Sequence, residues 1–185
     1  MKKILFLLPF IGSSLLQAQK FEVSVAYGTP SVYGVGNMFA DALVNIGTNS
    51  EEISGSNGVL NINALVYNHN MKWRYGLEFN VEFFEKKSQG YSTSSFISVL
   101  PRVDYFWSAA DKKLRLYSGA SAGILFSNGK YTDHTSNTKK NDNTAVFGFN
   151  IMPLGLRYGK DFGVFIEPNI GTRGFVNAGV SYIFL

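Results

Sequence analysis

The sequence predicts an all-β fold: an eight-stranded antiparallel up-and-down transmembrane β-barrel that follows an N-terminal signal peptide. Three observations carry this prediction. The chain begins with a short basic and then apolar segment, it contains eight runs in which apolar and polar residues alternate, and short and long connections alternate between these runs. A chain of 185 residues suits one such unit. We therefore expect a leader over residues 1–18 and a barrel over residues 19–185.

The N-terminal segment has the features of a secretory signal peptide. Lys2 and Lys3 precede an apolar stretch that only Pro9 interrupts, and Ala18 places a small residue at the expected cleavage point. The apolar stretch is far shorter than the ~20 residues that span a bilayer as a helix, which favours cleavage over a retained anchor. No later segment is a candidate membrane helix, so any membrane insertion must use strands.

Charge and cysteine content exclude several functions. Loss of the two leader lysines lowers the formal net charge from +4 to +2, which is too even to indicate a nucleic-acid partner. Cysteine is absent, so disulfides, thiolate catalysis and cysteine-ligated metals are excluded. No phosphate-binding glycine-rich loop, metal-ligand cluster or spaced pair of catalytic carboxylates is found, and we expect no cofactor and no metal.

The clearest strand is the run over residues 72–83, where aromatic and aliphatic residues occupy every second position. At ~3.3 Å per residue and a tilt near 45°, about ten such residues cover the ~25 Å apolar band of an outer membrane. The same alternation predicts seven further strands near residues 21–27, 60–66, 97–105, 114–124, 145–151, 164–170 and 176–184. Pro153 cannot donate to a ladder and the apolar parity slips beside it, so we expect a β-bulge there. Pro101 and Pro168 weaken their strands for the same reason.

Side-chain volume and charge indicate which face points inward. The interior of an eight-stranded barrel is only just wide enough for side chains, and the aromatic residues of the apolar face would crowd it. The polar face combines glycines with charges of both signs, which we interpret as an ion-pair network that plugs the lumen. The alternative is a soluble barrel whose charges face water and whose interior binds an apolar ligand. The network is predicted to contain Arg74, Glu78, Glu82, Arg102, Asp104, Arg115, Arg157 and Glu167.

Large aromatic rings gather near both ends of the predicted strands, as in the interfacial girdles of membrane barrels. Aromatic residues also favour strands in general, so this observation supports the membrane interpretation without proving it. The predicted girdle residues are Trp73, Tyr75, Tyr105 and Trp107 at one end, and Tyr27, Phe83, Tyr91 and Phe126 at the other.

The connections predict two different barrel ends. Short turns near residues 68–71, 108–112 and 158–161 would face the periplasm, and longer segments at 28–57, 85–93 and 127–144 would face the exterior, where 171–174 is brief. Within the first long segment, Phe39, Ala42, Leu43 and Ile46 recur at helical spacing. They indicate either a short helix across the barrel mouth or an ordered loop that packs its own apolar side chains. The polar composition of residues 128–143 predicts a solvated, mobile loop.

The chain resembles the small outer-membrane β-barrel proteins of Bacteroidota and, more distantly, the OmpA/OmpX-type eight-stranded barrels. The resemblance rests on Gln17-Ala18-Gln19, on residues 27–31 (YGTPS), on residues 153–160 (PLGLRYGK) and on residues 177–184 (NAGVSYIF). It implies outer-membrane lipid and the barrel-assembly machinery as partners. It also implies that Tyr182 and Phe184 act as the assembly signal of the last strand, although Leu185 departs from the aromatic ending of that family.

We therefore predict a non-enzymatic outer-membrane barrel with a structural, adhesive or surface-interaction role. An outer-membrane lipid-modifying enzyme is a rival hypothesis, because barrels of that kind use a histidine with a serine and a carboxylate. This chain offers only His69, in a predicted turn, and His134, in a predicted mobile loop with nothing to orient it. Minor transport of small solutes is a further alternative, but open channels need ~16 strands.

Overall fold

The computed structural model describes residues 20–48, 55–85, 91–132 and 139–184. It describes side chains in these ranges except at 44–48, 91–92, 130–132 and 139–142. The predicted leader at 1–18 and His134 therefore lie outside the described residues.

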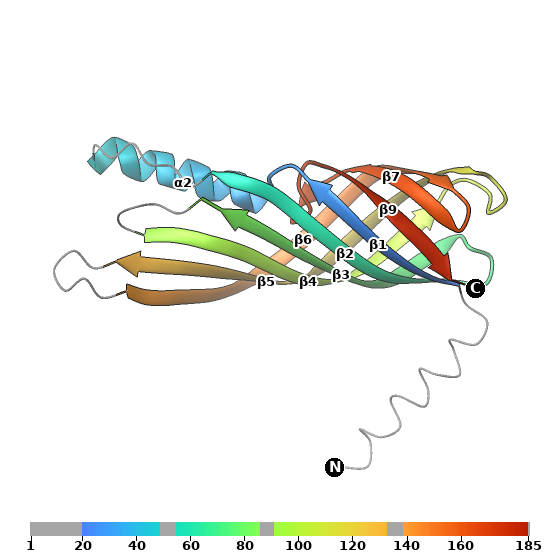
Figure 1. The fold of residues 1–185 in the computed structure, drawn as a ribbon, viewed down its shortest axis with the longest axis horizontal. Coiled ribbons are helices and arrows are strands. Elements are labelled where there is room, and N and C mark those ends of the chain that lie inside the picture. The colour runs from blue at the N-terminus through green and yellow to red at the C-terminus, as the bar shows by residue number, and fades with distance from the viewer. Residues whose placement is uncertain (1–19, 49–54, 86–90, 133–138, 185) are drawn as a thin grey trace, which may run out of the picture.

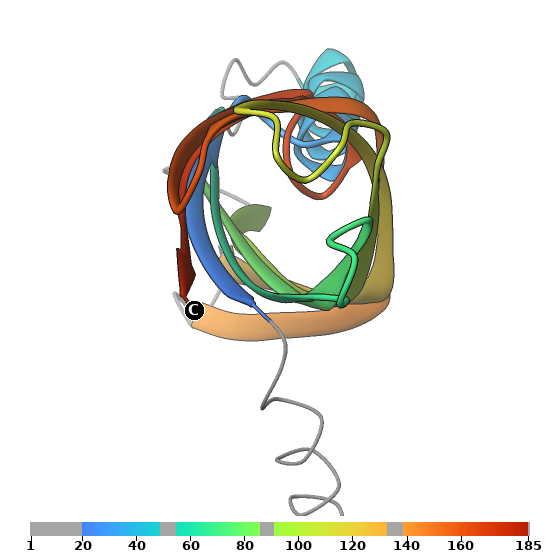
Figure 2. The same ribbon diagram turned by 90° about the vertical axis from the view of Figure 1, so that its right-hand side faces the viewer.

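The described residues form a closed antiparallel barrel, which confirms the predicted eight-stranded fold (Figures 1 and 2). β7 and β8 together occupy the seventh strand position, with Asn169 between them. β1 pairs with β9 from Phe21 opposite Phe184 onward, and β5 pairs with β6, so the sheet has no gap around the barrel. The strands are β1 (Phe21–Gly28), β2 (Ser56–Tyr67), β3 (Trp73–Phe84), β4 (Tyr91–Phe106), β5 (Leu114–Thr132), β6 (Lys139–Gly159), β7 (Phe162–Pro168), β8 (Ile170–Gly171) and β9 (Val176–Phe184).

The two barrel ends differ as the connections predict. Residues 68–72, 107–113 and 160–161 link strands at one end, which we call the short-turn end. The opposite end, which we call the long-loop end, carries the segments after β1, β3 and β5 and the brief turn at 172–175. Figure 1 places the C-terminus at the short-turn end, and Figure 2 views the barrel from that end.

Pro153 and Pro168 interrupt the ladders where the sequence indicates, whereas β4 runs through Pro101, which lies opposite Leu77 of β3. Tyr117 pairs with Gly155 and Gly119 pairs with Met152, so β6 contains one extra residue beside Pro153 and the predicted bulge is confirmed. The seventh strand breaks at Asn169, directly after Pro168, and resumes as β8. Because proline lacks the amide hydrogen that a ladder needs, each interruption has a local chemical cause.

The hairpin of β5 and β6 is longer than predicted. Its register continues from Asn128 opposite Asn143 to Thr132 opposite Lys139, so the expected loop over 127–144 is largely strand. Backbone hydrogen bonds hold such a ladder without any buried apolar face. A search for apolar alternation therefore misses it, because polar side chains on both faces leave no period to detect.

The first long segment contains helix α2 (Val32–Thr48). Figure 1 shows α2 leaving the barrel at the long-loop end and running outward. The expected helix is therefore present, but it does not cross the barrel mouth. Phe39 and Leu43 are 68% and 70% exposed, so their helical spacing does not mark a face packed on the barrel. Within the described residues, no helix combines the length and apolar character needed to span a bilayer.

Candidate functional site

The barrel interior contains a large group of buried polar and charged side chains, and it is the candidate functional site of the described structure. Polar and charged side chains of the strands point inward and are almost completely buried, while most large apolar side chains of the same strands point outward and are exposed. This arrangement follows from the strand period, because successive side chains lie on opposite faces of a sheet. β3 shows it directly: Arg74, Glu78, Asn80 and Glu82 are each at most 2% exposed.

Eight of the buried charges form one continuous chain of alternating sign. Arg74 bridges Glu22 and Asp104, with 2.6 Å between Arg74 Nη2 and Asp104 Oδ2. Arg102 bridges Asp104 and Glu167 at 2.8 Å each. In order from the short-turn end, the chain is Arg157, Glu22, Arg74, Asp104, Arg102, Glu167, Arg173 and Glu78. Four arginines and four carboxylates thus neutralise one another inside the barrel.

Hydroxyl groups donate further hydrogen bonds to three of these carboxylates. The Tyr67 hydroxyl donates to Glu22 and the Tyr117 hydroxyl donates to Glu167, both at 2.7 Å. Ser121 Oγ donates to Glu78 Oε1 at 2.8 Å. Because charge-assisted hydrogen bonds are about twice as strong as neutral ones, these contacts fix the carboxylates in place.

Aromatic rings close the short-turn end beneath this chain. Tyr67, Phe106 and Tyr117 are each at most 1% exposed, and the Phe106 and Tyr117 rings stack at 4.8 Å. The Arg74 guanidinium lies over the Tyr117 ring at 4.9 Å. Cation–π contacts of this kind strengthen when water is excluded. The predicted girdle residues do not include these three rings, and the sequence prediction did not foresee an inner aromatic layer.

Two predicted members of the network, Glu82 and Arg115, have other partners. Among the described residues, Glu82 accepts hydrogen bonds from Ser31 and Ser56, and no arginine lies within ion-pair distance. Arg115 donates to the Met71 carbonyl at 2.5 Å and lies 3.8 Å from the centre of the Phe106 ring. The reason is position: Glu82 is at the long-loop end and Arg115 at the short-turn end, beyond the reach of the central charges.

The charge chain also contains two residues that the sequence prediction omitted, Glu22 and Arg173. Glu22 lies between Phe21 and Val23 in β1, so its inward direction could have been inferred from the apolar alternation of that strand. Arg173 lies in the turn between β8 and β9, where no period exists, and it forms an ion pair with Glu167, with 2.6 Å between Nη1 and Oε2. Nothing in the local sequence distinguishes it from a solvent-exposed turn arginine.

The predicted girdle residues take outward positions where their side chains are described. Trp73, Tyr105 and Trp107 form a row at the short-turn end, with neighbouring ring centres 4.9 and 5.0 Å apart. Tyr75 is on the same outward face of β3. At the long-loop end, Tyr27, Phe83 and Phe126 are exposed. Tyr91 begins β4, but its side chain lies outside the described set.

The predicted assembly-signal residues lie on the outer face of the last strand. Tyr182 and Phe184 are 48% and 47% exposed, and their rings contact each other at 4.8 Å. Phe184 also contacts Phe21 of β1 at 6.0 Å, across the seam where the two ends of the chain meet.

The start of α2 is attached to the barrel through Ser31. Its hydroxyl accepts a hydrogen bond from the Gly34 amide at 2.9 Å, which caps the helix, and donates to Glu82 at 2.5 Å. The Glu82 carboxylate also lies where the positive end of the helix dipole stabilises an anion. A cavity of about 10 Å³ between this anchor and the charge chain has barely the volume of one water molecule. The described side chains therefore leave little free space between the anchor and the charge chain.

Removing the Ser31 hydroxyl tests this anchor. Ser31→Ala is expected to cost about 1–2 kcal/mol, because it removes a helix cap and a partner of a buried carboxylate. Amide hydrogen exchange should accelerate at Gly34 and Val35. Ser56→Ala is the matched control, because it removes a hydrogen bond to Glu82 and leaves the cap intact. Equal exchange rates in the two variants would contradict the anchoring role of Ser31.

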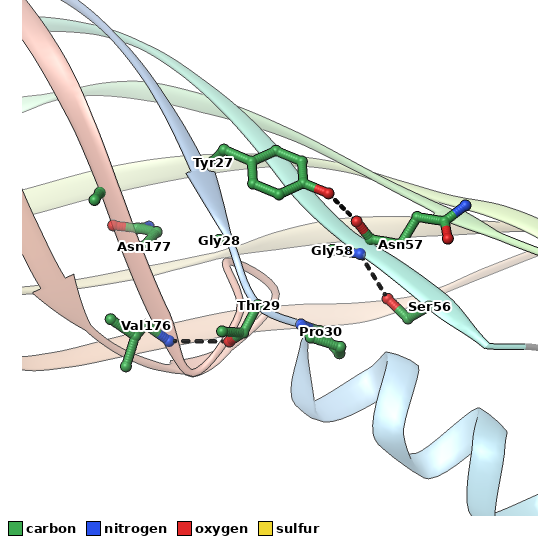
Figure 3. A pocket seen from close by; sticks show the side chains of 10 residues that line it. Tyr27, Gly28, Thr29, Pro30, Ser56, Asn57, Gly58, Val176 and Asn177 are labelled. Carbon is green, nitrogen blue, oxygen red and sulfur yellow. Dashed lines mark hydrogen bonds between the residues drawn. The ribbon is translucent and has the colours of Figure 1, made fainter.

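A shallow groove of about 400 Å³ lies outside the barrel at the long-loop end, between β9, β1 and β2 (Figure 3). The Tyr27 hydroxyl donates to the Asn57 carbonyl across it, and the Val176 amide donates to Thr29 Oγ1 at 3.2 Å. The register of β2 against β3 shifts here, and Gly58 adopts a φ of 91° that other residues rarely take. The groove is open and carries no cluster of charged side chains.

The lipid-modifying hypothesis depends on His69 and His134, of which only His69 lies within the described residues. His69 lies in the exposed turn between β2 and β3 at the short-turn end. Among the described residues, no three histidine, aspartate or glutamate side chains are arranged to hold a metal ion.

Comparisons with known proteins agree with the fold. No family model matches the chain, and no curated protein matches it in sequence. Among solved structures, it is similar to Neisserial surface protein A (NspA), with a TM-score of 0.51 and 11% identity over 91% of this chain and 98% of that one. It also matches the N-terminal β-barrel domain of Pseudomonas aeruginosa OprF, with a TM-score of 0.47 and 13% identity over 89% of this chain and 97% of that one. The likeness to NspA concerns the fold alone, which in this chain is a closed eight-stranded antiparallel barrel.

Proposed function

We propose that this chain is an integral outer-membrane protein without enzymatic activity, in which a sealed barrel carries a projecting end for structural, adhesive or surface-interaction roles. The observation that carries the membrane assignment is the apolar outer face. Every strand position of the barrel contributes an exposed aliphatic side chain near its middle: Val25, Ile62, Leu77, Val99, Ile124, Ile151, Ile166 and Val180. A continuous apolar surface of this extent is unfavourable in water and matches lipid.

The charged interior disfavours the two alternatives that need an open lumen. An apolar ligand would have to replace the buried ion pairs, which leaves charges without partners. Passage of solutes would require the same contacts to break, and the aromatic layer at the short-turn end would still obstruct the path. These features support a barrel that does not conduct.

The projecting end supports the surface-interaction role. β6 pairs with β5 along its length, but in the described residues its other side has a strand partner only from Asn150 onward. The Tyr33 hydroxyl donates to the Phe147 carbonyl on that side, and residues 139–145 lie beyond it. Val146 and Phe147, consecutive residues on opposite faces, are both exposed. An extended segment of another polypeptide could add to this edge by backbone pairing, which is a common mode of recognition.

Labelling of single cysteines tests the location and the orientation together. The chain has no cysteine of its own, so Asn143→Cys at the projecting hairpin and Lys113→Cys in a short turn provide unique sites. A membrane-impermeant maleimide added to intact cells is expected to label position 143 and to reach position 113 only after lysis. Labelling of neither position in the membrane fraction, with the protein recovered in the aqueous fraction, would refute the proposal.

Conductance measurements test the sealed lumen. Purified full-length mature protein in planar bilayers is expected to give no large, stable single-channel current, because the central ion pairs and the inner aromatic layer occupy the path. Reproducible long-lived openings would instead support the transport alternative.

A further inference from the structure

A second polar region lies at the short-turn end, the end that faces the viewer in Figure 2. It is a pocket of about 270 Å³ between the turns and the base of the barrel. Lys112 and Lys160 line it from two different turns, and Lys20 lines it from the residue before β1. Arg115 and Arg157 line it from the interior, so five basic side chains surround the pocket against two acidic ones, Asp111 and Asp161.

Arg115 is the unusual member of this group. The residue is 2% exposed, yet among the described residues no carboxylate lies within ion-pair distance of it. One of its terminal nitrogens donates to Met71, and its Nε has no hydrogen-bond partner. Arg173 also has nitrogens without hydrogen bonds, but carboxylates at 2.6 and 3.7 Å balance its charge. A buried guanidinium without a counter-charge is strongly unfavourable, so an anion from outside the chain would stabilise it.

The nearest interior carboxylate is already occupied by other groups. Glu22 contacts Arg74 and Arg157 and accepts a hydrogen bond from Tyr67. Arg157 directs two further nitrogens to the carbonyls of Gly159 and Asp161, at 3.2 and 3.3 Å. No interior acid is left for Arg115, and the excess positive charge of this end faces the pocket.

We propose that this pocket binds a phosphate group, with Arg115 at its inner wall and Lys112 and Lys160 at its rim. A phosphate offers several acceptor oxygens and at least one negative charge, which matches a guanidinium with a free donor and exposed ammonium groups around it. The volume admits a phosphate with a small substituent. The group can come from free phosphate or from the headgroup of a phospholipid at the adjacent membrane surface.

Calorimetric titration of the folded protein in a non-ionic detergent tests the site. Inorganic phosphate is expected to bind saturably, and the double change Lys112→Ala and Lys160→Ala is expected to weaken binding about tenfold or more, because two charged donors are lost. Lys113→Ala is the control: Lys113 is exposed beside Lys112, it does not line the pocket, and its loss removes one of the two positive charges that the double variant removes. Binding in this variant should stay within about twofold of the wild type.

A second titration identifies the source of the phosphate and guards against misfolding. Glycerophosphoethanolamine represents a phospholipid headgroup: tighter binding than inorganic phosphate assigns the site to lipid, and weaker binding assigns it to the free ion. Arg115→Gln keeps most of the side-chain volume, and its folding is checked by heat-modifiable gel mobility. A folded Arg115→Gln variant that binds as the wild type does, equal losses in the Lys112/Lys160 and Lys113 variants, or no saturable binding of either probe would overturn the proposal.

Discussion

The variant Arg102→Met is expected to unfold with a free energy about 3–5 kcal/mol lower than that of the wild type. Arg102 contacts Asp104 and Glu167 at 2.8 Å and Glu78 at 3.9 Å, so its loss leaves three buried carboxylates with fewer counter-charges. Equilibrium unfolding in urea, in the presence of lipid vesicles, measures the difference. The folded fraction in each sample follows from heat-modifiable gel mobility.

Arg115→Met is the control for this experiment. It removes the same charge from another buried arginine, but Arg115 has no carboxylate partner among the described residues. The expected loss is therefore much smaller, and relief of an uncompensated charge offsets part of the lost packing. Similar losses in the two variants would show that burial of an arginine, and not the alternating chain, determines the stability of the barrel.

The variant Leu77→Arg is expected to destabilise the membrane-inserted barrel by about 2–4 kcal/mol. Leu77 is 54% exposed on the outer face of β3, between Trp73 near one end and Phe83 near the other. At ~3.3 Å per residue and a tilt near 45°, it lies close to the middle of the ~25 Å apolar band. The guanidinium of the new arginine would lie among the lipid acyl chains, where a charge is unfavourable.

Leu114→Arg is the matched control for the second experiment. Leu114 is equally exposed, at 53%, but it begins β5 at the short-turn end, where the cost of a charge falls to about 0–1 kcal/mol. Folding equilibria in lipid vesicles measure both variants. If the barrel were soluble, both arginines would face water, and the two variants would have nearly the same stability.

The sequence was sufficient to predict the parts of the fold that depend on the strand period. Alternation placed Arg74, Glu78 and Arg102 inside and Leu77 outside, because a strand with two different environments must show a period of two. The same parity could have placed Glu22. The bulge at Pro153 was predictable because a missing amide hydrogen is a local property of the residue.

The remaining features depend on tertiary position, and the sequence does not encode them locally. The Arg173 side chain reaches the barrel interior from a turn, where it pairs with Glu167. Glu82 accepts a hydrogen bond from Ser31 because α2 begins beside it. The extension of β5 and β6 to Thr132 and Lys139 has no apolar period to reveal it. The position of a buried charge along the barrel axis likewise determines its partners. Arg115 lies at the short-turn end, and the nearest interior carboxylate there, Glu22, is already paired with other groups.

The alternating charge chain constrains how the barrel can be assembled. Except for the Arg102–Asp104 pair within β4, its links join different elements: Glu22 of β1 contacts Arg74 of β3, and Arg102 of β4 contacts Glu167 of β7. A hairpin of β3 and β4 alone would carry Glu82 into hydrocarbon without Ser31 and Ser56, and Glu78 with only the Arg102 ion pair at 3.9 Å, at a high energetic cost. Neutrality is reached only when strands from both halves of the chain have met. Insertion and closure must therefore proceed together, because a hairpin-by-hairpin route would expose unpaired ions to lipid.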